Sequence, residues 1–234
     1  MDIGGFQKNS MIDFPKTIAC IIFTQGCNFI CPYCHNPDLV AGSRKGVGDL
    51  YDQDRIFEFL EKRKGFLEGV VITGGEPTLQ KDLIDFCRKV KDMGYQLKLD
   101  SNGTRPAVLA NLFDGCLVDF ISMDIKTSLE NYHLVAPGKV DTKKIFKSIR
   151  MIMEKAPAYE FRTTCLKPFV NKDIMDDIGK MIKGASRYIL QKCSQNATVL
   201  DPQFLKLDNI FFSDKQMMEL KITIDKYVGE SVVR

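Results

Sequence analysis

The chain has 234 residues, with no tryptophan and only two histidines, His35 and His133. With so few imidazoles, neither a Ser–His–Asp nor a Cys–His–Asn triad is credible, which excludes hydrolases built on those triads. We expect His133 to lie on the surface. His35 and Asn36 are expected to support a neighbouring loop rather than to act in catalysis.

Long apolar runs and a strong charge of one sign are also missing. No run of about 18 apolar residues is present, which excludes a membrane-spanning helix. The net charge is only +3 and the basic residues are scattered, so we expect no nucleic-acid partner. Residues Met1 to Gly5 lack the basic and apolar regions of a signal peptide. We therefore expect a cytoplasmic protein without a membrane partner.

Eight cysteines are present, but a cytoplasmic chain keeps its thiols reduced, so disulfides are not expected. Three of them cluster at Cys27, Cys31 and Cys34. The others are isolated, mostly within apolar segments, and we expect them to pack as small buried apolar residues. These isolated cysteines are Cys20, Cys87, Cys116, Cys165 and Cys193.

Apolar segments of strand length alternate with segments of helical periodicity. The expected strands are 17–24, 69–73, 95–100, 120–125, 159–166 and 187–191. The expected helices are 52–64, 79–93, 106–113, 141–154, 174–182 and 214–228. This alternation is typical of βαβ units and a parallel sheet. Because the units fall short of a closed eight-stranded barrel, we predict an α/β fold with a partial (β/α)6 TIM-like barrel, although periodicity does not distinguish it from an open sheet.

The composition does not change abruptly along the chain, so we expect a single domain over 1–234. Within it, residues 1–16 are expected to form an irregular or hairpin lead-in, and 17–193 the barrel core. Residues 194–234 are expected to form a C-terminal extension that contains the last helix. A Gly-rich segment at 42–48 is expected on the surface.

Unusual polar residues directly follow the predicted strands. Cys27–Cys34 follow the first strand, Gly74–Pro77 the second and Asp100–Gly103 the third, while Asp124 and Lys126 lie at the end of the fourth. In barrels and in open α/β sheets, functional sites form at the carboxyl ends of the strands. One active site at this edge accounts for all four groups.

The spacing Cys27-x3-Cys31-x2-Cys34 places three thiols on one short loop. Structural zinc sites and iron–sulfur clusters usually have four protein ligands, and the sequence has no second Cys-x2-Cys pair. His35 is adjacent to Cys34, and adjacent residues rarely converge on one metal. Three thiolates with an open fourth position are expected where a substrate coordinates the metal. A zinc-binding interaction module is the alternative from another class of protein.

A second motif, Gly74-Gly75-Glu76-Pro77, follows the next strand. Two glycines allow the backbone to approach a ligand closely and to adopt positive φ. Glu76 offers a carboxylate to an amine, and Pro77 makes the turn rigid. By itself, the segment favours an ordinary strand-to-helix turn with a capping role.

The two motifs together, with Tyr33 before the third cysteine, resemble the radical S-adenosylmethionine superfamily over the whole chain. The resemblance implies a barrel of the radical SAM type and a [4Fe–4S] cluster, in which the three clustered cysteines bind three irons. It implies that the amino and carboxylate groups of S-adenosyl-L-methionine (SAM) chelate the fourth iron. Gly74, Gly75 and Glu76 then bind the methionine amine, and Tyr33 packs near the adenine.

A narrower resemblance is to the activating enzymes of glycyl radical enzymes. It is carried by Cys31-Pro32-Tyr33-Cys34-His35-Asn36, Leu99-Asp100-Ser101-Asn102-Gly103 and Met123-Asp124-Ile125-Lys126. The lead-in over residues 3–15 and the pair Leu190-Gln191 look most like the activating proteins of anaerobic ribonucleoside-triphosphate reductase. Since no cysteine lies between Cys34 and Gly74, a single cluster is expected.

The family pattern implies roles for further residues. Asp100, Ser101 and Asp124 are expected to help bind a monovalent cation beside SAM. Asn102, Asp124 and Lys126 are expected to contact the cofactor itself.

Two positions differ from the activator of pyruvate formate-lyase. Asp13 matches an aspartate that meets the substrate glycine loop there, but that enzyme continues Asp-Gly-Pro where this chain has Asp13-Phe14-Pro15. That activator also has a late histidine near the cofactor, whereas here no histidine follows His133. Gln191 or Arg162 is a candidate for that region.

The resemblance implies that the reduced cluster gives one electron to SAM, which splits into methionine and a 5′-deoxyadenosyl radical. This radical is expected to abstract hydrogen from a glycine of a partner glycyl radical enzyme, anaerobic ribonucleoside-triphosphate reductase in the first place. No catalytic residue beyond the cluster and SAM is expected, and the electron donor is expected to be flavodoxin or ferredoxin. The alternatives are activation of pyruvate formate-lyase or another glycyl radical enzyme, and radical chemistry on a small molecule.

Overall fold

The computed structural model describes residues 1–40, 51–136 and 140–234, so the Gly-rich segment 42–48 lies outside the described residues. The strands are β1 (Ile3–Ser10), β2 (Ala19–Thr24), β3 (Gly69–Gly74), β4 (Gln96–Ser101), β5 (Phe120–Asp124), β6 (Tyr159–Cys165), β7 (Arg187–Lys192) and β8 (Glu230–Val233). The α-helices are α1 (Pro37–Val40), α2 (Gln53–Lys62), α3 (Leu83–Asp92), α4 (Pro106–Asp114), α5 (Tyr132–Val135), α6 (Thr142–Lys155), α7 (Lys172–Met181) and α8 (Asp214–Ile224). Short 3-10 helices are η1 (Pro77–Leu79), η2 (Leu129–Asn131) and η3 (Phe204–Lys206).

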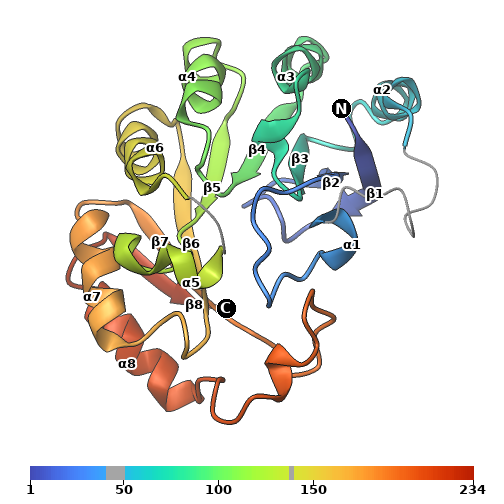
Figure 1. The fold of residues 1–234 in the computed structure, drawn as a ribbon. Coiled ribbons are helices and arrows are strands. Elements are labelled where there is room, and N and C mark those ends of the chain that lie inside the picture. Colours follow the sequence, from blue (N-terminus) through green and yellow to red (C-terminus); the bar gives the residue numbers. More distant parts are fainter. Residues whose placement is uncertain (41–50, 137–139) are drawn as a thin grey trace.

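All eight strands form one sheet in the order of the sequence. β1 is antiparallel to β2, and each later neighbouring pair is parallel. The sheet curves into an arc with α2, α3, α4, α6, α7 and α8 along its outer side (Figure 1). Among the described strands, no pairing joins β8 to β1, so the arc does not close. These features confirm the predicted partial barrel, whose parallel strands are the six predicted ones, β2–β7, and in addition β8.

Side chains alternate between the two sides of the sheet, as the strand period requires. On the outer side, residues such as Ile22 and Ile72 pack with helix residues such as Leu60 and Phe86 in the main hydrophobic core. A second, smaller core lies on the inner side and consists of Phe14, Ala19, Ile21 and Val71. The sheet therefore has apolar packing on both sides near β2 and β3.

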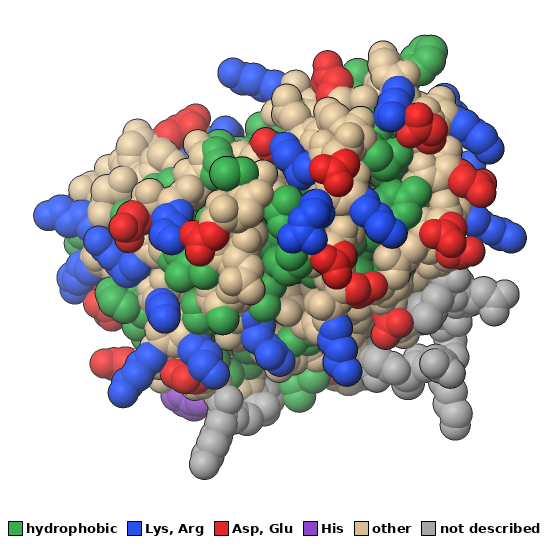
Figure 2. Space-filling model, turned by 90° about the horizontal axis from the view of Figure 1, so that it is seen from above, with side chains coloured by type: hydrophobic (Ala, Val, Ile, Leu, Met, Phe, Trp, Pro, Cys, Tyr) green, Lys and Arg blue, Asp and Glu red, His purple; other side chains and the backbone are tan. Residues whose placement is uncertain are grey.

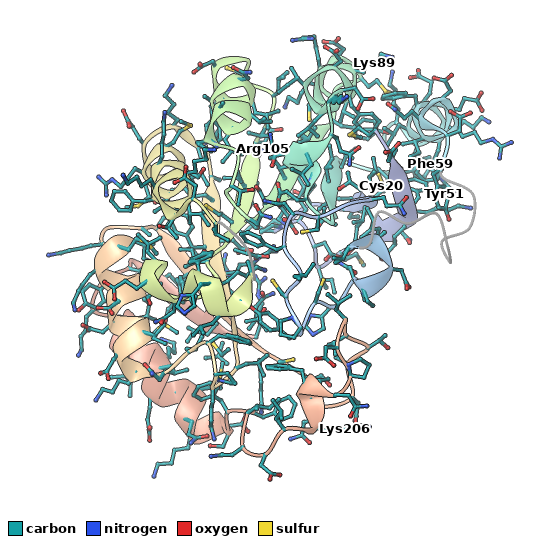
Figure 3. All side chains as sticks on the ribbon, in the orientation of Figure 1. Cys20, Tyr51, Phe59, Lys89, Arg105 and Lys206 are labelled. Atoms are coloured by element: carbon teal, nitrogen blue, oxygen red, sulfur yellow. The ribbon has the colours of Figure 1, made fainter. Side chains whose placement is uncertain are left out.

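Aromatic contacts secure the β1 edge of the sheet. The Phe6 ring lies 5.0 Å from that of Phe59 and 6.2 Å from that of Tyr51, both with edge-on geometry. Phe59 and Tyr51 are labelled at this edge in Figure 3. On the face seen in Figure 2, Lys and Arg side chains are interspersed with Asp and Glu. None of the described helices has the length and apolar character needed to cross a bilayer.

Local signals set most helix ends. Asn171 accepts a hydrogen bond from the Ile174 amide at 2.8 Å and so caps α7. Ser213 and Gln216 form a capping box at the start of α8. Gly94, with φ of 89°, follows α3 and permits the turn into β4.

Several expectations need correction. The expected helix 79–93 starts only at Leu83, because Pro77–Leu79 form a separate 3-10 turn. The last helix ends at Ile224 rather than 228, because the chain turns there to enter β8, a strand that was not predicted. Cys116 is exposed rather than buried, because it lies in the turn after α4 with φ of 51°. His133 is exposed, as predicted.

Candidate functional site

One cavity of about 370 Å³ lies at the carboxyl ends of β2–β7. Every residue that the sequence assigned to the cluster, SAM, the cation or the substrate loop lines this cavity. His35, Asn36, Arg162 and Gln191 line it as well, together with unpredicted residues such as Thr73 and Thr164. The parallel sheet therefore brings together groups that are far apart in the sequence.

The cysteine loop leaves β2 through Gly26, whose φ is 91°. Within the loop, the Cys34 amide donates to the Cys31 carbonyl at 3.0 Å, and the Phe29 amide donates to the Cys27 thiol sulfur at 3.4 Å. Burial raises the pKa of Cys27 to about 12 and also raises that of Cys31. In the metal-free chain these thiols are therefore protonated, and metal binding must displace their protons.

The arrangement of the thiols bears on the kind of metal centre. A single tetrahedral zinc ion needs its sulfur ligands within roughly 4 Å of one another, given the Zn–S bond length. Over the described ranges, no three His, Cys, Asp or Glu side chains converge in a way that would hold one metal ion. In a four-iron cluster each thiolate binds a different iron, so the sulfurs lie further apart. Cys27, Cys31 and Cys34 all line the cavity and supply ligands for three irons of such a cluster.

The C-terminal extension covers the cysteine loop from outside the sheet. The Leu200 amide donates to the Cys34 carbonyl at 3.1 Å, and the Asp201 amide donates to the Pro32 carbonyl at 2.9 Å. Phe204 stacks on Phe169 at 5.5 Å, and both rings contact Tyr33. This cover was not predicted, because backbone hydrogen bonds between distant segments leave no sequence signal.

Tyr33 is buried beside the cavity, and its ring packs against Phe169 at 5.2 Å. Among the described residues, its hydroxyl finds no hydrogen-bond partner. A buried hydroxyl without a partner costs free energy, and a ligand in the cavity would supply one. Contact between Tyr33 and a bound cofactor stays a prediction.

The Gly74-Gly75 turn packs tightly against the start of the cysteine loop. Gly74 has φ of 115°, and a Cβ on Gly75 would lie 2.1 Å from the Gly26 carbonyl oxygen. The Gly75 amide donates to the Thr24 carbonyl at 2.8 Å. The glycines are therefore required for contact between two backbone segments, in addition to any approach to a ligand.

Glu76 is almost fully buried. Its carboxylate accepts hydrogen bonds from the Thr78 backbone N–H at 3.1 Å, from the Ser101 hydroxyl at 2.9 Å and from the Asn102 backbone N–H at 2.7 Å. The Thr78 hydroxyl also donates to it. Burial raises the pKa of Glu76, although these hydrogen bonds favour the ionised form. In this geometry Glu76 holds the end of β4 to the turn after β3, and its contact with the methionine amine stays a prediction.

Asp100 and Asp124 lie at the ends of β4 and β5 and share one arginine. Arg162, the direct register partner of Asp124 on β6, donates to it through Nε at 2.9 Å and to Asp100 through Nη1 at 3.2 Å. Lys126 pairs with Asp124 at 2.9 Å, and Lys98 pairs with Asp100 at 2.5 Å. We call these five residues the ion network.

The ion network holds its carboxylates in the charged form. Burial disfavours ionised Asp124, but Arg162 and Lys126 more than offset this effect and lower the pKa of Asp124. Arg162 and Lys98 likewise lower the pKa of Asp100 against the effect of burial. Burial opposes the charge of Lys126 as well, yet the Asp124 carboxylate raises the pKa of Lys126 well above the usual value.

Three other predicted residues complete the walls. Asp13 accepts a hydrogen bond from the Ser10 hydroxyl at 2.5 Å and lines the cavity from the lead-in. Asn102 donates through Nδ2 to the Asn28 side chain at 2.9 Å, which ties the end of β4 to the cysteine loop. His35 lies 3.8 Å from the Cys193 sulfur, and burial lowers the pKa of its imidazole.

Comparisons with known proteins agree with this site. The family profile described as the radical SAM superfamily matches residues 21–181. A Methanocaldococcus jannaschii protein that is provisionally named a glycyl-radical enzyme activating enzyme is 31% identical over 99% of this chain and 95% of its own length. The pyruvate formate-lyase-activating enzyme of Listeria monocytogenes is 35% identical over half of each chain.

A solved structure is similar in fold. It is a domain of the pyruvate-formate lyase-activating enzyme from Bacteroides vulgatus, with a TM-score of 0.54 and 16% identity, over 71% of this chain and 98% of that domain. Together with the sequence matches, this likeness confirms the resemblance that the cysteine and Gly-Gly-Glu-Pro motifs predicted.

Proposed function

The chain belongs to the radical SAM superfamily, and from this premise we propose that it activates anaerobic ribonucleoside-triphosphate reductase by taking a hydrogen atom from one glycine of that enzyme. The protein is a radical SAM enzyme of the group that includes the glycyl-radical-enzyme activating enzymes. The observation that carries the proposal is the single cavity that joins the three thiols, the Gly-Gly-Glu turn and Asp13.

In this proposal Cys27, Cys31 and Cys34 hold a [4Fe–4S] cluster through three of its irons. When bound, the reduced cluster and SAM supply the 5′-deoxyadenosyl radical that abstracts the glycine hydrogen. The protein's own part is to bind, to orient and to exclude water. Phe204 and Phe169 shield Tyr33 and the loop behind it from solvent.

Polar groups along the sheet edge orient the SAM molecule. The backbone of Gly74 and Gly75 lies where the turn comes closest to the cysteine loop. Lys126, held in place by Asp124, keeps its positive charge across the physiological pH range and suits the carboxylate of the methionine moiety. The hydroxyl of Tyr33 offers a hydrogen bond to the same ligand.

The lead-in supports a protein substrate. Asp13 lines the cavity, and the preceding residues Met11 and Ile12 are 74% and 85% exposed. Two large apolar side chains so exposed beside a cavity-lining carboxylate suit the docking of a partner's loop. In this proposal a glycine-bearing loop of the partner reaches the cavity from the open side of the arc. A flavodoxin or ferredoxin is the proposed electron donor.

The test is anaerobic reconstitution with iron and sulfide, followed by incubation with the candidate reductase, SAM and a reductant. We expect a glycyl radical signal in electron paramagnetic resonance and, with the partner's glycine deuterated, deuterium in the 5′-deoxyadenosine. Cys31→Ala is expected to abolish the signal by removing a cluster ligand. Cys87→Ala, a change at a buried cysteine in α3, is the matched control and is expected to retain the signal.

Three outcomes would overturn the proposal. A radical signal that persists in Cys31→Ala would refute the cluster assignment. SAM cleavage that yields a radical on pyruvate formate-lyase but not on the reductase would move the assignment to that partner. Deuterium transfer only from a small molecule would remove the protein substrate altogether.

A further inference from the structure

Each carboxylate oxygen of the ion network already bonds a cationic side chain. For Asp100, Oδ1 pairs with Lys98, and Oδ2 accepts from Arg162 and from the Thr73 hydroxyl at 3.1 Å. For Asp124, Oδ1 accepts from Arg162 and Oδ2 from Lys126. All four oxygens therefore have partners within the chain.

A monovalent cation between these aspartates needs oxygen ligands, because Na⁺ and K⁺ bind hard donors. The third expected ligand, Ser101, is also engaged, since its hydroxyl donates to Glu76 at 2.9 Å and accepts from the Gly103 amide at 3.1 Å. A cation entering this place would meet two carboxylates that three cationic side chains already neutralise.

Arg162 already performs the electrostatic role that such a cation would have. It reaches from β6 across β5, and two different nitrogens of one planar guanidinium bond the two carboxylates. Without it, Asp100 and Asp124 would face each other across neighbouring strands with like charge. With it, three positive side chains meet two negative ones, which leaves a surplus positive charge for the carboxylate of a bound SAM molecule.

We propose that the Arg162 guanidinium takes the place of a monovalent cation in this enzyme, so that SAM binding does not depend on Na⁺ or K⁺. Arg162 is thus a positioning residue that fixes Asp124 and, through Asp124, Lys126. The proposal rests on SAM binding in the radical SAM site and not on which enzyme supplies the glycine.

The test measures SAM binding to the anaerobically reconstituted protein, without any partner enzyme, in KCl, NaCl or choline chloride at equal ionic strength. For the wild type we expect the dissociation constants in the three salts to agree within about twofold. Arg162→Gln is expected to bind SAM about tenfold more weakly in choline chloride, with much of that loss recovered in KCl or NaCl because a cation can enter the emptied place.

Arg88→Gln is the matched control, because Arg88 is exposed and pairs with Asp85 on the same helix. It is expected to behave as the wild type in all three salts. A wild-type affinity that falls severalfold in choline chloride would overturn the proposal, and so would an Arg162→Gln protein whose loss no cation relieves. Absence of SAM binding in every protein would instead contradict the assigned cofactor, and a normal salt profile without a glycyl radical would contradict only the proposed partner.

Discussion

The inner side of the arc has two halves with opposite chemistry. Near β2 and β3 it carries the small apolar core of Phe14, Ala19, Ile21 and Val71. Across β4–β6, inward positions carry the ion network instead. Both halves use the same alternation of side chains along a strand, so the backbone does not distinguish them.

The comparison of the two halves separates residues that stabilise the fold from residues that are expected to bind a ligand. The apolar half includes residues of β2, the strand that leads into the cysteine loop. It contributes packing, which does not depend on a bound ligand. The charged half costs desolvation and is stable only while each charge has its partner. Ligand recognition is therefore expected to depend on the charged half, and folding stability more on the apolar half.

The largest expected effect comes from a substitution in the apolar half. Phe14 is 4% exposed and lies 6.0 Å from the ring of Phe120, so Phe14→Ala should lower the free energy of unfolding by about 3 kcal/mol through lost burial and a residual cavity. Urea titration of the anaerobic protein measures this change. The dissociation constant of SAM for the folded fraction should stay nearly the same.

Phe146→Ala provides the comparison for that measurement, because Phe146 lies on α6 and is 43% exposed. We expect it to change the free energy of unfolding by less than about 1 kcal/mol. If Phe14→Ala weakened SAM binding as strongly as a change in the ion network does, the division between the two halves would not hold.

A smaller effect on stability, with a distinct pH dependence, is expected from Asp124→Asn. The loss of one partner of Arg162 and Lys126 should lower the free energy of unfolding by about 2 kcal/mol at neutral pH. Because the folded-state pKa of Asp124 lies below the usual 3.8, its contribution is complete above that value and is lost as the pH falls through the folded-state pKa. The difference between variant and wild type should therefore be constant above about pH 5 and shrink in more acidic solution.

Urea titrations across this pH range, with Asp85→Asn alongside, test the assignment. Asp85 has a 75% exposed side chain in a surface ion pair, so its replacement should cost under about 0.5 kcal/mol. A difference between Asp124→Asn and wild type that did not diminish in acid would show that the stability comes from a group other than this carboxylate.

The smallest expected effect concerns the cover over the cysteine loop. Leu200→Pro removes the amide that donates to the Cys34 carbonyl and should cost about 1 kcal/mol. The reconstituted cluster should lose iron to a chelator faster than in the wild type. Leu200→Ala keeps the amide and should release iron more slowly than Leu200→Pro, whereas equal rates would assign the effect to the side chain.

Much of the site was predictable because its signals are local. Cys27, Cys31 and Cys34 stand close together in the sequence, and Gly74 to Glu76 directly follow a strand. The period of apolar residues predicted the parallel sheet, and a parallel sheet brings strand ends to one edge. Those two facts were enough to predict that the motifs share a cavity.

The rest depends on pairings between segments far apart in the chain. A charged residue inside a strand, such as Lys98 or Arg162, gives no sign of its partner, and only register places Arg162 beside Asp124. β8 was missed because Glu230–Val233 is short and joins the sheet through β7. The sequence also gives no sign that the Glu76 carboxylate accepts from Ser101 of β4 and from the Asn102 backbone, in addition to Thr78 in its own turn.

The backbone bonds from Leu200 and Asp201 to the cysteine loop also set an order of events during protein synthesis. The loop leaves the ribosome before the segment around Leu200 that completes its hydrogen bonds. Until then the thiols lie in an unfinished loop without their aromatic cover. We therefore expect iron and sulfide to be inserted after this covering segment has been made, when the loop has its hydrogen bonds and its aromatic cover.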